Sequence, residues 1–181
     1  MRRSLAVLAV LAMSLLGACG GSDDPAPSSG ATTAAADDSS DDSGGSTEAL
    51  DACTVLSVDE VGTILGGTVT AEEVPGGGCS FDQEDPRAPS TSISGVVGAG
   101  GGFDASKGGN VTSGEVEDVA GVGDGAWVAI GTTGGDNQQG QGVAAVGDQL
   151  INVAVIQGNG LDAAAVRTMT VDLLTLAASK A

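Results

Sequence analysis

The feature that most limits what this chain can fold into is the segment of residues 20–49. It contains no Leu, Ile, Val, Phe or Trp, and it carries acidic residues but no Lys or Arg. Such a segment cannot bury an apolar core, so we expect it to be disordered and to act as a spacer on the order of 30 Å long. A folded domain is therefore expected in residues 50–181, which have the length of one domain.

Residues 1–18 have the charge and the apolar core of a signal peptide. Two arginines precede an apolar stretch that is shorter than the roughly 20 residues of a membrane-spanning helix, so a permanent transmembrane anchor is the weaker interpretation. We expect cleavage of this segment instead, because residues 16–19, Leu-Gly-Ala-Cys, resemble a bacterial lipobox. At such a motif the cysteine thiol is diacylglycerylated and the chain is cut just before it. We expect Cys19 to become the lipidated first residue of the mature chain.

A lipid on Cys19 would place the chain on the outer face of the cytoplasmic membrane. Two acyl chains hold a protein stably to a bilayer, at about 0.8 kcal/mol per buried methylene. No basic patch is then needed, and the expected spacer is acidic. The alternative is an ordinary signal peptide with an accidental cysteine. The export route, general secretory or twin-arginine, stays open.

Lipidation of Cys19 decides how the other two cysteines are counted. Cys53 and Cys79 then remain as an even pair in an exported domain, where oxidation is expected. A disulfide between them would stabilise the domain by roughly 3 to 4 kcal/mol. Their spacing is not that of a CxxC redox motif.

The composition excludes several classes of function. The chain has no His, so it lacks the Ser-His-Asp and Cys-His pairs of common hydrolases and the imidazole ligands of common metal sites. Its net charge of −18 becomes about −20 without the two signal-peptide arginines, which argues against nucleic acid as a partner. We expect no cofactor and no metal. Acidic neighbours remain at Glu72-Glu73, Glu84-Asp85 and Glu117-Asp118, but sequence neighbours point to opposite faces of a strand.

Three short motifs are interpreted as linker or loop. Asp37 begins a stretch that departs from a calcium-binding loop at two required positions. Residues 121–126, GVGDGA, have the spacing of a dinucleotide-binding turn but precede a strand-like run instead of a helix. Residues 98–109, GAGGGFDASKGG, lack the residues that a phosphate loop needs around Lys107. In the last two motifs, glycine is expected to supply positive φ in turns.

The first half of the domain has clear helix and strand signals. Ser57 and Glu60 form a capping box, and Gly66 ends the apolar periodicity, so a short helix is predicted between them. Strands are predicted at residues 68–74, 79–83 and 91–97. Nothing in residues 84–118 is diagnostic apart from the last of these strands.

The second half predicts an antiparallel meander followed by a helix. Residues 126–131, 141–147 and 149–157 are β-rich, and Gly147-Asp148 suits a tight hairpin between the last two. Residues 162–178 carry apolar residues at helical spacing and should pack on the sheet. The single Trp, Trp127, opens the first of these strands. It is a candidate binding residue, although a core position is the more ordinary role for a buried aromatic.

Several of these motifs occur in the order found in a family of actinobacterial secreted lipoproteins that share a domain of unknown function. The stretches that carry the resemblance are CTVLSVDEVGTILGG, CSF and GVGDGAWVAI. Residue by residue, it maps onto Cys19, Cys53, Cys79, Gly66, Gly121, Gly123 and Trp127. The resemblance implies an α+β fold with a cysteine pair, a short first helix, a curved antiparallel sheet and a C-terminal helix. It implies no catalytic role.

Together these features predict a membrane-anchored extracytoplasmic lipoprotein with an α+β domain, a curved antiparallel sheet packed by a short N-terminal and a C-terminal helix. We expect a binding or interaction module for a small molecule, a lipid or a protein, and not an enzyme. The alternatives are a carboxylate-dependent hydrolase of the cell envelope and a structural envelope lipoprotein. An apolar pocket between sheet and helix would favour binding, and two converging buried carboxylates would favour catalysis.

Overall fold

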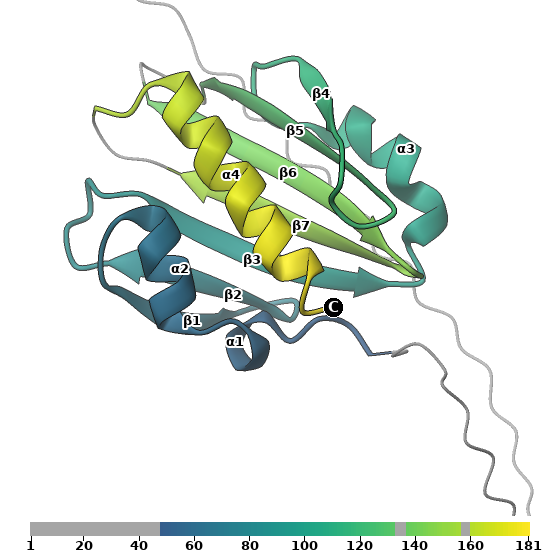
Figure 1. The fold of residues 1–181 in the computed structure, drawn as a ribbon, viewed down its shortest axis with the longest axis horizontal. Coiled ribbons are helices and arrows are strands. Elements are labelled where there is room, and N and C mark those ends of the chain that lie inside the picture. Colours follow the sequence, from purple (N-terminus) through teal and green to yellow (C-terminus); the bar gives the residue numbers. More distant parts are fainter. Residues whose placement is uncertain (1–47, 133–136, 157–159) are drawn as a thin grey trace, which may run out of the picture. The chain divides into compact units, whose positions relative to one another are not determined.

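The computed structural model describes residues 48–132, 137–156 and 160–181. The expected signal peptide, the lipidation site Cys19 and the spacer up to residue 47 lie outside the described residues. The described part is an α+β domain with a seven-stranded antiparallel sheet and helices on both of its sides (Figure 1). The predicted fold class is confirmed.

The sheet has the order β1-β2-β3-β7-β6-β5-β4, and every neighbouring pair is antiparallel. Its strands are β1 (Val69–Val74), β2 (Gly78–Gln83), β3 (Ser90–Val97), β4 (Val116–Val119), β5 (Gly125–Thr132), β6 (Gln138–Val146) and β7 (Gln149–Ile156). The predicted hairpin is present, since Gly147 has φ of 56° in the turn between β6 and β7. Two meanders, β1-β2-β3 and β4-β5-β6-β7, are therefore joined where β3 pairs with β7.

Capping side chains begin the two longer helices, and a glycine ends the first of them. The helix α2 (Val58–Leu65) starts at the predicted capping box, in which Ser57 Oγ accepts from Glu60 N–H and Glu60 Oε2 accepts from Ser57 N–H. It ends at Gly66, which has a left-handed φ of 80°. The helix α4 (Ala163–Ala178) is capped by Asp162 and matches the predicted C-terminal helix. Among the described residues, no helix has the length and apolar character needed to cross a bilayer.

The main core lies between the sheet and α4, which runs across β5, β6 and β7 (Figure 1). Val166, Leu173 and Leu174 of α4 are fully buried against it. Two glycines of β6 let the helix approach closely: a Cβ on Gly140 would overlap Thr170 Oγ1, and one on Gly142 would crowd the Leu174 side chain. Burial of this apolar surface is the largest stabilising contribution in the domain.

The disulfide joins Cys53 to Cys79, as predicted. Cys53 lies in α1 (Ala52–Val55), a one-turn helix that the sequence patterns do not predict, and Cys79 is fully buried in β2. The bond fixes the segment that enters the domain to the β1-β2 side of the sheet. Leu50, just before α1, is also held there, since its N–H donates to the buried Gln149 Oε1 at 3.1 Å.

The stretch without diagnostic patterns, residues 84–118, contains three elements between the predicted strand and the start of β4. These are the 3-10 turn η1 (Gly100–Gly102), the short helix α3 (Phe103–Ser106) and the 3-10 turn η2 (Lys107–Gly109). They lie on the opposite side of the sheet from α4 (Figure 1). After them the chain reaches the far edge of the sheet and forms β4. None of these elements is longer than four residues, which is too short to leave a periodic signal.

Candidate functional site

The two faces of the sheet are closed in different ways. Side chains alternate along each strand, so in β7 Ile151, Val153 and Val155 face α4 while the residues between them face the other way. We call the side opposite α4 the open face. On it, an apolar cluster from β5, β6 and Leu150 of β7 packs against Ala99, Phe103 and Val116. Beside this cluster, β3, β6 and β7 carry serine and amide side chains.

The open face contains a hollow of about 110 Å³. Its side chains come from three adjacent strands and one loop, and their polar groups are hydroxyls and amides. The residues lining it are Ser92, Ser94, Val111, Gln139, Gln141, Asn152, Ala154 and also Val153, whose side chain faces α4. We refer to this site as the hollow.

The strand register brings these polar groups together. Ser92 pairs with Ala154, and Ala154 pairs on its other side with Gln141, so the three residues form one row across β3, β7 and β6. Ser94 and Asn152 form the next row. The row is flat near Ala154 because alanine is small, which leaves space between the longer side chains on either side.

In residues 139–142, Gln-Gly-Gln-Gly, alternate residues face opposite sides of the sheet. The two glycines face α4 and permit its close approach, while Gln139 and Gln141 face the hollow. The Gln141 side chain is fixed by the loop beside it, since its Oε1 accepts from Val111 N–H at 2.8 Å. Val111 and Ile156 are exposed apolar residues at 68% and 56%, and Val111 forms part of the hollow's wall.

Trp127, the candidate binding residue, does not line the hollow. It is fully buried on the neighbouring part of the open face, in a second apolar cluster with Ala129, Val143, Ala145 and Leu150. Its indole Nε1–H donates to Ser106 Oγ at 2.8 Å. The core role that the sequence favours agrees with this burial, although the cluster is separate from the main core.

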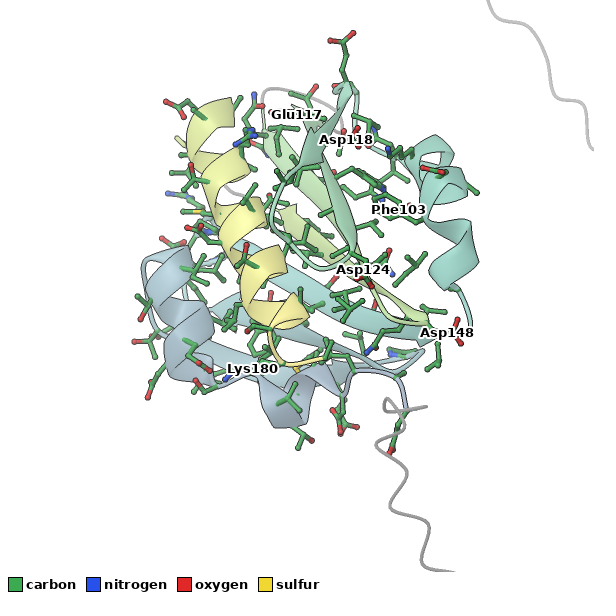
Figure 2. All side chains as sticks on the ribbon, turned by 45° about the vertical axis from the view of Figure 1, so that its right-hand side comes forward. Phe103, Glu117, Asp118, Asp124, Asp148 and Lys180 are labelled. Atoms are coloured by element: carbon green, nitrogen blue, oxygen red, sulfur yellow. A yellow bond between two sulfur atoms is a disulfide. The ribbon has the colours of Figure 1, made fainter. Side chains whose placement is uncertain are left out.

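Two neighbouring carboxylates of β4 point to opposite sides of the sheet, as expected for adjacent residues in a strand (Figure 2). On the α4 side, Glu117 accepts from Arg167 Nε at 3.0 Å, and a hydrogen bond from this guanidinium holds the pKa of Glu117 below its ordinary 4.5. On the open face, Asp118 lies 2.7 Å from Lys107 Nζ, and its hydrogen bond raises the pKa of Lys107 above 10.5. These acids therefore attach two helical segments to the sheet edge.

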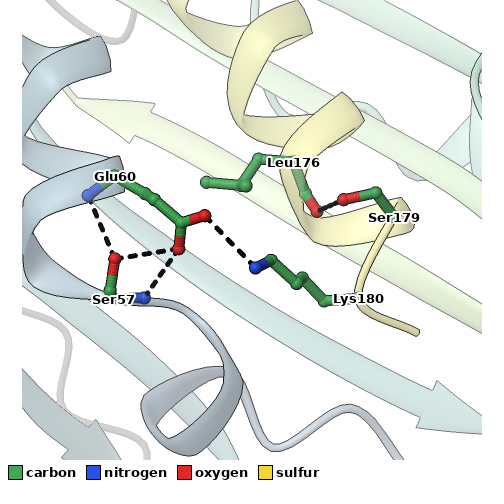
Figure 3. Close-up of polar contacts among 5 residues, drawn as sticks. All are labelled: Ser57, Glu60, Leu176, Ser179 and Lys180. Carbon is green, nitrogen blue, oxygen red and sulfur yellow. Dashed lines mark hydrogen bonds and ion pairs between the residues drawn. The ribbon is translucent and has the colours of Figure 1, made fainter.

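A third ion pair joins the two helices of the α4 side (Figure 3). Lys180 Nζ lies 3.2 Å from Glu60 Oε1. The pKa of Glu60 is lowered first by its hydrogen bond with Ser57 and then by Lys180. The capping box thus holds the carboxylate in position for the C-terminal lysine.

The glycine motif at residues 121–126 forms a turn, as the sequence predicts. Gly121 and Gly123 have φ of 80° and 54°. A Cβ on Gly123 would overlap Ala145 O, so the turn lies directly on β6. Asp124, which follows Gly123 within the motif, accepts from Gly147 N–H at 2.8 Å. This bond ties the turn to the β6-β7 hairpin. Asp124 and Asp148 lie at the same end of the strands (Figure 2). The motif has a structural role.

Larger depressions lie at the β1 side of the domain, with volumes of about 520, 510 and 370 Å³. The first is lined by exposed side chains at the ends of α2, such as Asp59 and Thr63, and the second by Glu84 and Asp85 of a surface loop. The third lies beside Glu48 and Glu73. Their size reflects open spaces between elements. The smaller hollow has half-buried polar groups converging from three strands, so we consider it the better candidate site.

Sequence patterns predicted the strands that carry the hollow but not the site itself. Serine at residues 92 and 94 and glutamine at 139 and 141 each recur with period two, which is a signal for a polar strand face. Their convergence depends on the β3-β7 pairing between residues 63 positions apart in the sequence, such as Thr91 Oγ1 and Ala154 O. The space between sheet and helix, where an apolar pocket would have favoured binding, is filled by the α4 core, and the hollow lies on the opposite face.

Comparison with known proteins gives no relative for this chain: no family model matches it, and neither a curated protein nor a solved structure is similar to it.

Proposed function

We propose that the chain is a lipid-anchored extracytoplasmic binding module whose site is the hollow on the open face of the sheet. The anchor is Cys19, and the ligand is an uncharged molecule that presents hydroxyl or amide groups. The sequence supports the anchor through its lipobox-like residues 16–19. The geometry of the hollow supports the class of ligand.

The observation that carries the proposal is the chemistry of the lining. Ser94, Gln139, Gln141 and Asn152 are half-buried and come from three strands. Each side-chain amide has N–H donors and a carbonyl acceptor, and each hydroxyl can donate or accept a hydrogen bond. Such a set is complementary to sugar hydroxyls or to a peptide-like amide, which also donate and accept. A net charge of −18 disfavours anionic ligands as well.

The size of the hollow limits what enters it. Pockets for drug-sized ligands usually measure about 300–1,000 Å³, whereas the hollow measures about 110 Å³. A single sugar ring or an acetamido group fits this space better than a whole oligosaccharide does. We infer that the hollow recognises one unit of a longer or larger molecule.

The binding test uses N-acetylglucosamine oligosaccharides, which are neutral and carry both hydroxyls and amides. The full chain is made with Cys19→Ser so that it carries no lipid, and amide NMR shifts are followed during titration. We expect saturable shifts in β3, β6 and β7, and at least a tenfold loss of affinity in Asn152→Leu, because one half-buried hydrogen-bonding partner is removed. Gln138→Leu is the matched control, since it removes an amide from β6, the strand next to β7, at a position outside the hollow.

The outcomes separate the three functional hypotheses. Shifts that Asn152→Leu abolishes and Gln138→Leu preserves support binding in the hollow. Release of shortened saccharides would overturn the binding proposal in favour of a carboxylate-dependent hydrolase. Absence of shifts with these saccharides and with neutral peptides would overturn it in favour of a structural envelope protein.

The anchor is tested separately. Cys19→Ala should abolish lipidation and leave either uncleaved precursor or released protein, because alanine has no thiol to form the thioether at the lipobox position. Intact mass of the membrane fraction measures this. Finding the wild-type chain there with a free Cys19 thiol would contradict the proposal.

A further inference from the structure

Residues 99–110, which we call the strap, cross the open face over Trp127 and are fixed at both ends. At the start, Gly98 N–H donates to Asp148 O at 2.8 Å. At the end, Asn110 Nδ2 donates to Gly114 O and Asn110 Oδ1 accepts from Thr112 N–H, both at 2.9 Å, which closes a firm turn. The strap is thus a loop between two fixed points.

Between these points the strap is attached to the sheet by side chains. Its backbone bonds are local, from Gly102 N–H to Ala99 O and from Asn110 N–H to Lys107 O. The sheet is reached by the hydrogen bond between Ser106 and Trp127, by the ion pair of Lys107 with Asp118, and by the Phe103 ring against Gly125. No residue of α3 or η2 is fully buried.

The strap is also rich in glycine, which favours an open state through its conformational entropy. Gly100, Gly101, Gly102, Gly108 and Gly109 belong to its twelve residues. Segments with few buried apolar contacts and exposed hydrogen bonds open at a lower free energy than the core does. Trp127, the largest fully buried side chain among the described residues, therefore lies under a segment whose helical turns contain no fully buried residue.

We propose that the strap opens as a unit and that the apolar floor around Trp127 then extends the hollow into a site for an uncharged amphiphile. This inference rests on the proposed function for the polar end of the ligand. The two parts of the site are adjacent in the sheet, since Val143 of the floor pairs with Asn152 of the hollow and Ala129 of the floor pairs with Gln141. An apolar chain or ring would lie on the floor while its hydroxyl-bearing head occupies the hollow.

One contact links the two parts. Gln141 Oε1 accepts from the N–H of Val111, which directly follows the last residue of the strap and lies within its fixed turn. A ligand hydroxyl that takes the place of Val111 N–H on this amide oxygen removes the contact between the loop and the sheet. Occupation of the hollow therefore weakens one attachment of the strap's C-terminal end, and this favours the open state.

The opening is measured by hydrogen exchange of the Trp127 indole N–H. The chain contains one Trp, so its indole NMR signal is unique. In the full Cys19→Ser chain, we expect this N–H to exchange at least a hundredfold faster, relative to its intrinsic rate, than the amide of Val153 in the centre of the sheet. Equal protection of the two groups would overturn the proposal, because Trp127 would then be exposed only by global unfolding.

Two strap variants test the cause of the opening. Ser106→Ala removes the indole's acceptor and should speed its exchange at least fivefold. Ser179→Ala is the matched control, since it removes a like hydroxyl bond, to Leu176 O at 2.7 Å, away from the strap (Figure 3). Replacing Gly101, Gly102, Gly108 and Gly109 together by Ala should slow exchange about tenfold. Each position has room for a Cβ, and indole exchange that is unchanged in this variant would contradict the proposal.

The ligand class is tested with octyl glucoside below its micelle-forming concentration. We expect a saturable shift of the indole signal, absent with methyl glucoside, and about tenfold weaker in the four-alanine variant because the competent state is less populated. An octyl glucoside shift of equal affinity in that variant would overturn the gating role, and no shift would overturn the ligand class. If the chain does not bind the saccharides but the Trp127 indole N–H still exchanges faster than the Val153 amide, only the proposed function is overturned.

Discussion

The two faces of the sheet are closed by segments of opposite character. On one face lies α4, a capped helix of 16 residues whose Leu173 and Leu174 are fully buried. On the other lies the strap, whose helix α3 has four residues and buries none of them. One sheet therefore has a firmly packed side and a weakly covered side.

This difference separates stability from function within one small domain. The α4 side contains the main apolar cluster and the disulfide, so most of the free energy of folding is expected to come from it. The open face holds the hollow and the strap, and changes there should alter binding more than stability. Open-face mutations that lower stability more than mutations of the α4 side do would contradict this division between the two faces.

The largest expected effect is loss of the disulfide on the firmly packed side. Cys53→Ser opens a loop of 26 residues and should lower the free energy of unfolding by about 3.5 kcal/mol on the chain-entropy model. Urea denaturation of the full chain measures it. The variant leaves Trp127 and the hollow untouched.

The control for this variant is chemical reduction. A reducing agent should destabilise the wild-type chain to the level of Cys53→Ser and leave the variant unchanged. If both lose stability equally on reduction, the effect does not come from the Cys53–Cys79 bond.

The next effect compares one large apolar residue from each side. Leu173→Ala removes a fully buried side chain from the main core and should cost about 3 kcal/mol. Phe103→Ala removes a half-buried ring from the strap and should cost about 1 kcal/mol, while it increases acrylamide quenching of Trp127. Equal costs in thermal or urea unfolding would show that the strap side is a second core.

A smaller effect distinguishes the faces within a single strand. In β6, Gly140 faces α4 and Gln141 faces the hollow. Gly140→Ala should cost about 2 kcal/mol because its Cβ would overlap Thr170 Oγ1. Gln141→Ala should stay within about 0.5 kcal/mol, as is usual for residues outside the core. A reversed order in urea denaturation would contradict the assignment of the two faces.

The sequence predicts much of the firmly packed side because its signals are local and long. The capping box at Ser57, the stop at Gly66 and the periodic residues before Ala178 each lie within one element. The disulfide follows from counting cysteines once Cys19 is assigned to lipid. These are the patterns that fix helix ends and hairpins through neighbouring residues.

The open face is harder to predict because its features depend on distant pairs. The hollow exists only where β3 meets β7, and the strap exists only because residues after β3 cross the face before β4 forms. Glycine-rich sequence predicts a loop at residues 98–109 but not what the loop covers. Trp127 is similarly ambiguous from sequence, since burial under a loop and burial in a core leave the same strand pattern.

The smallest effect concerns pH and the ion pair that attaches α4 to the sheet edge. The Arg167 hydrogen bond lowers the pKa of Glu117 below the ordinary 4.5. A lowered folded-state pKa means that the unfolded chain binds the proton more tightly, so this contribution to stability is present above about pH 4.5 and is lost as pH falls through the folded value. The pair is exposed, and the effect should be small and weaker in salt.

Arg167→Gln should therefore lower the melting temperature at pH 6 and flatten its decrease between pH 5 and pH 3, relative to the wild-type chain. The net charge of −18 acts in the opposite direction, because protonation relieves repulsion among the acids. Arg87→Gln is the matched control, since it removes the same charge from the exposed loop after β2, where the described residues show no ion pair to it. If both variants change the pH profile equally, net charge and not the attachment of α4 sets the acid stability of the packed face.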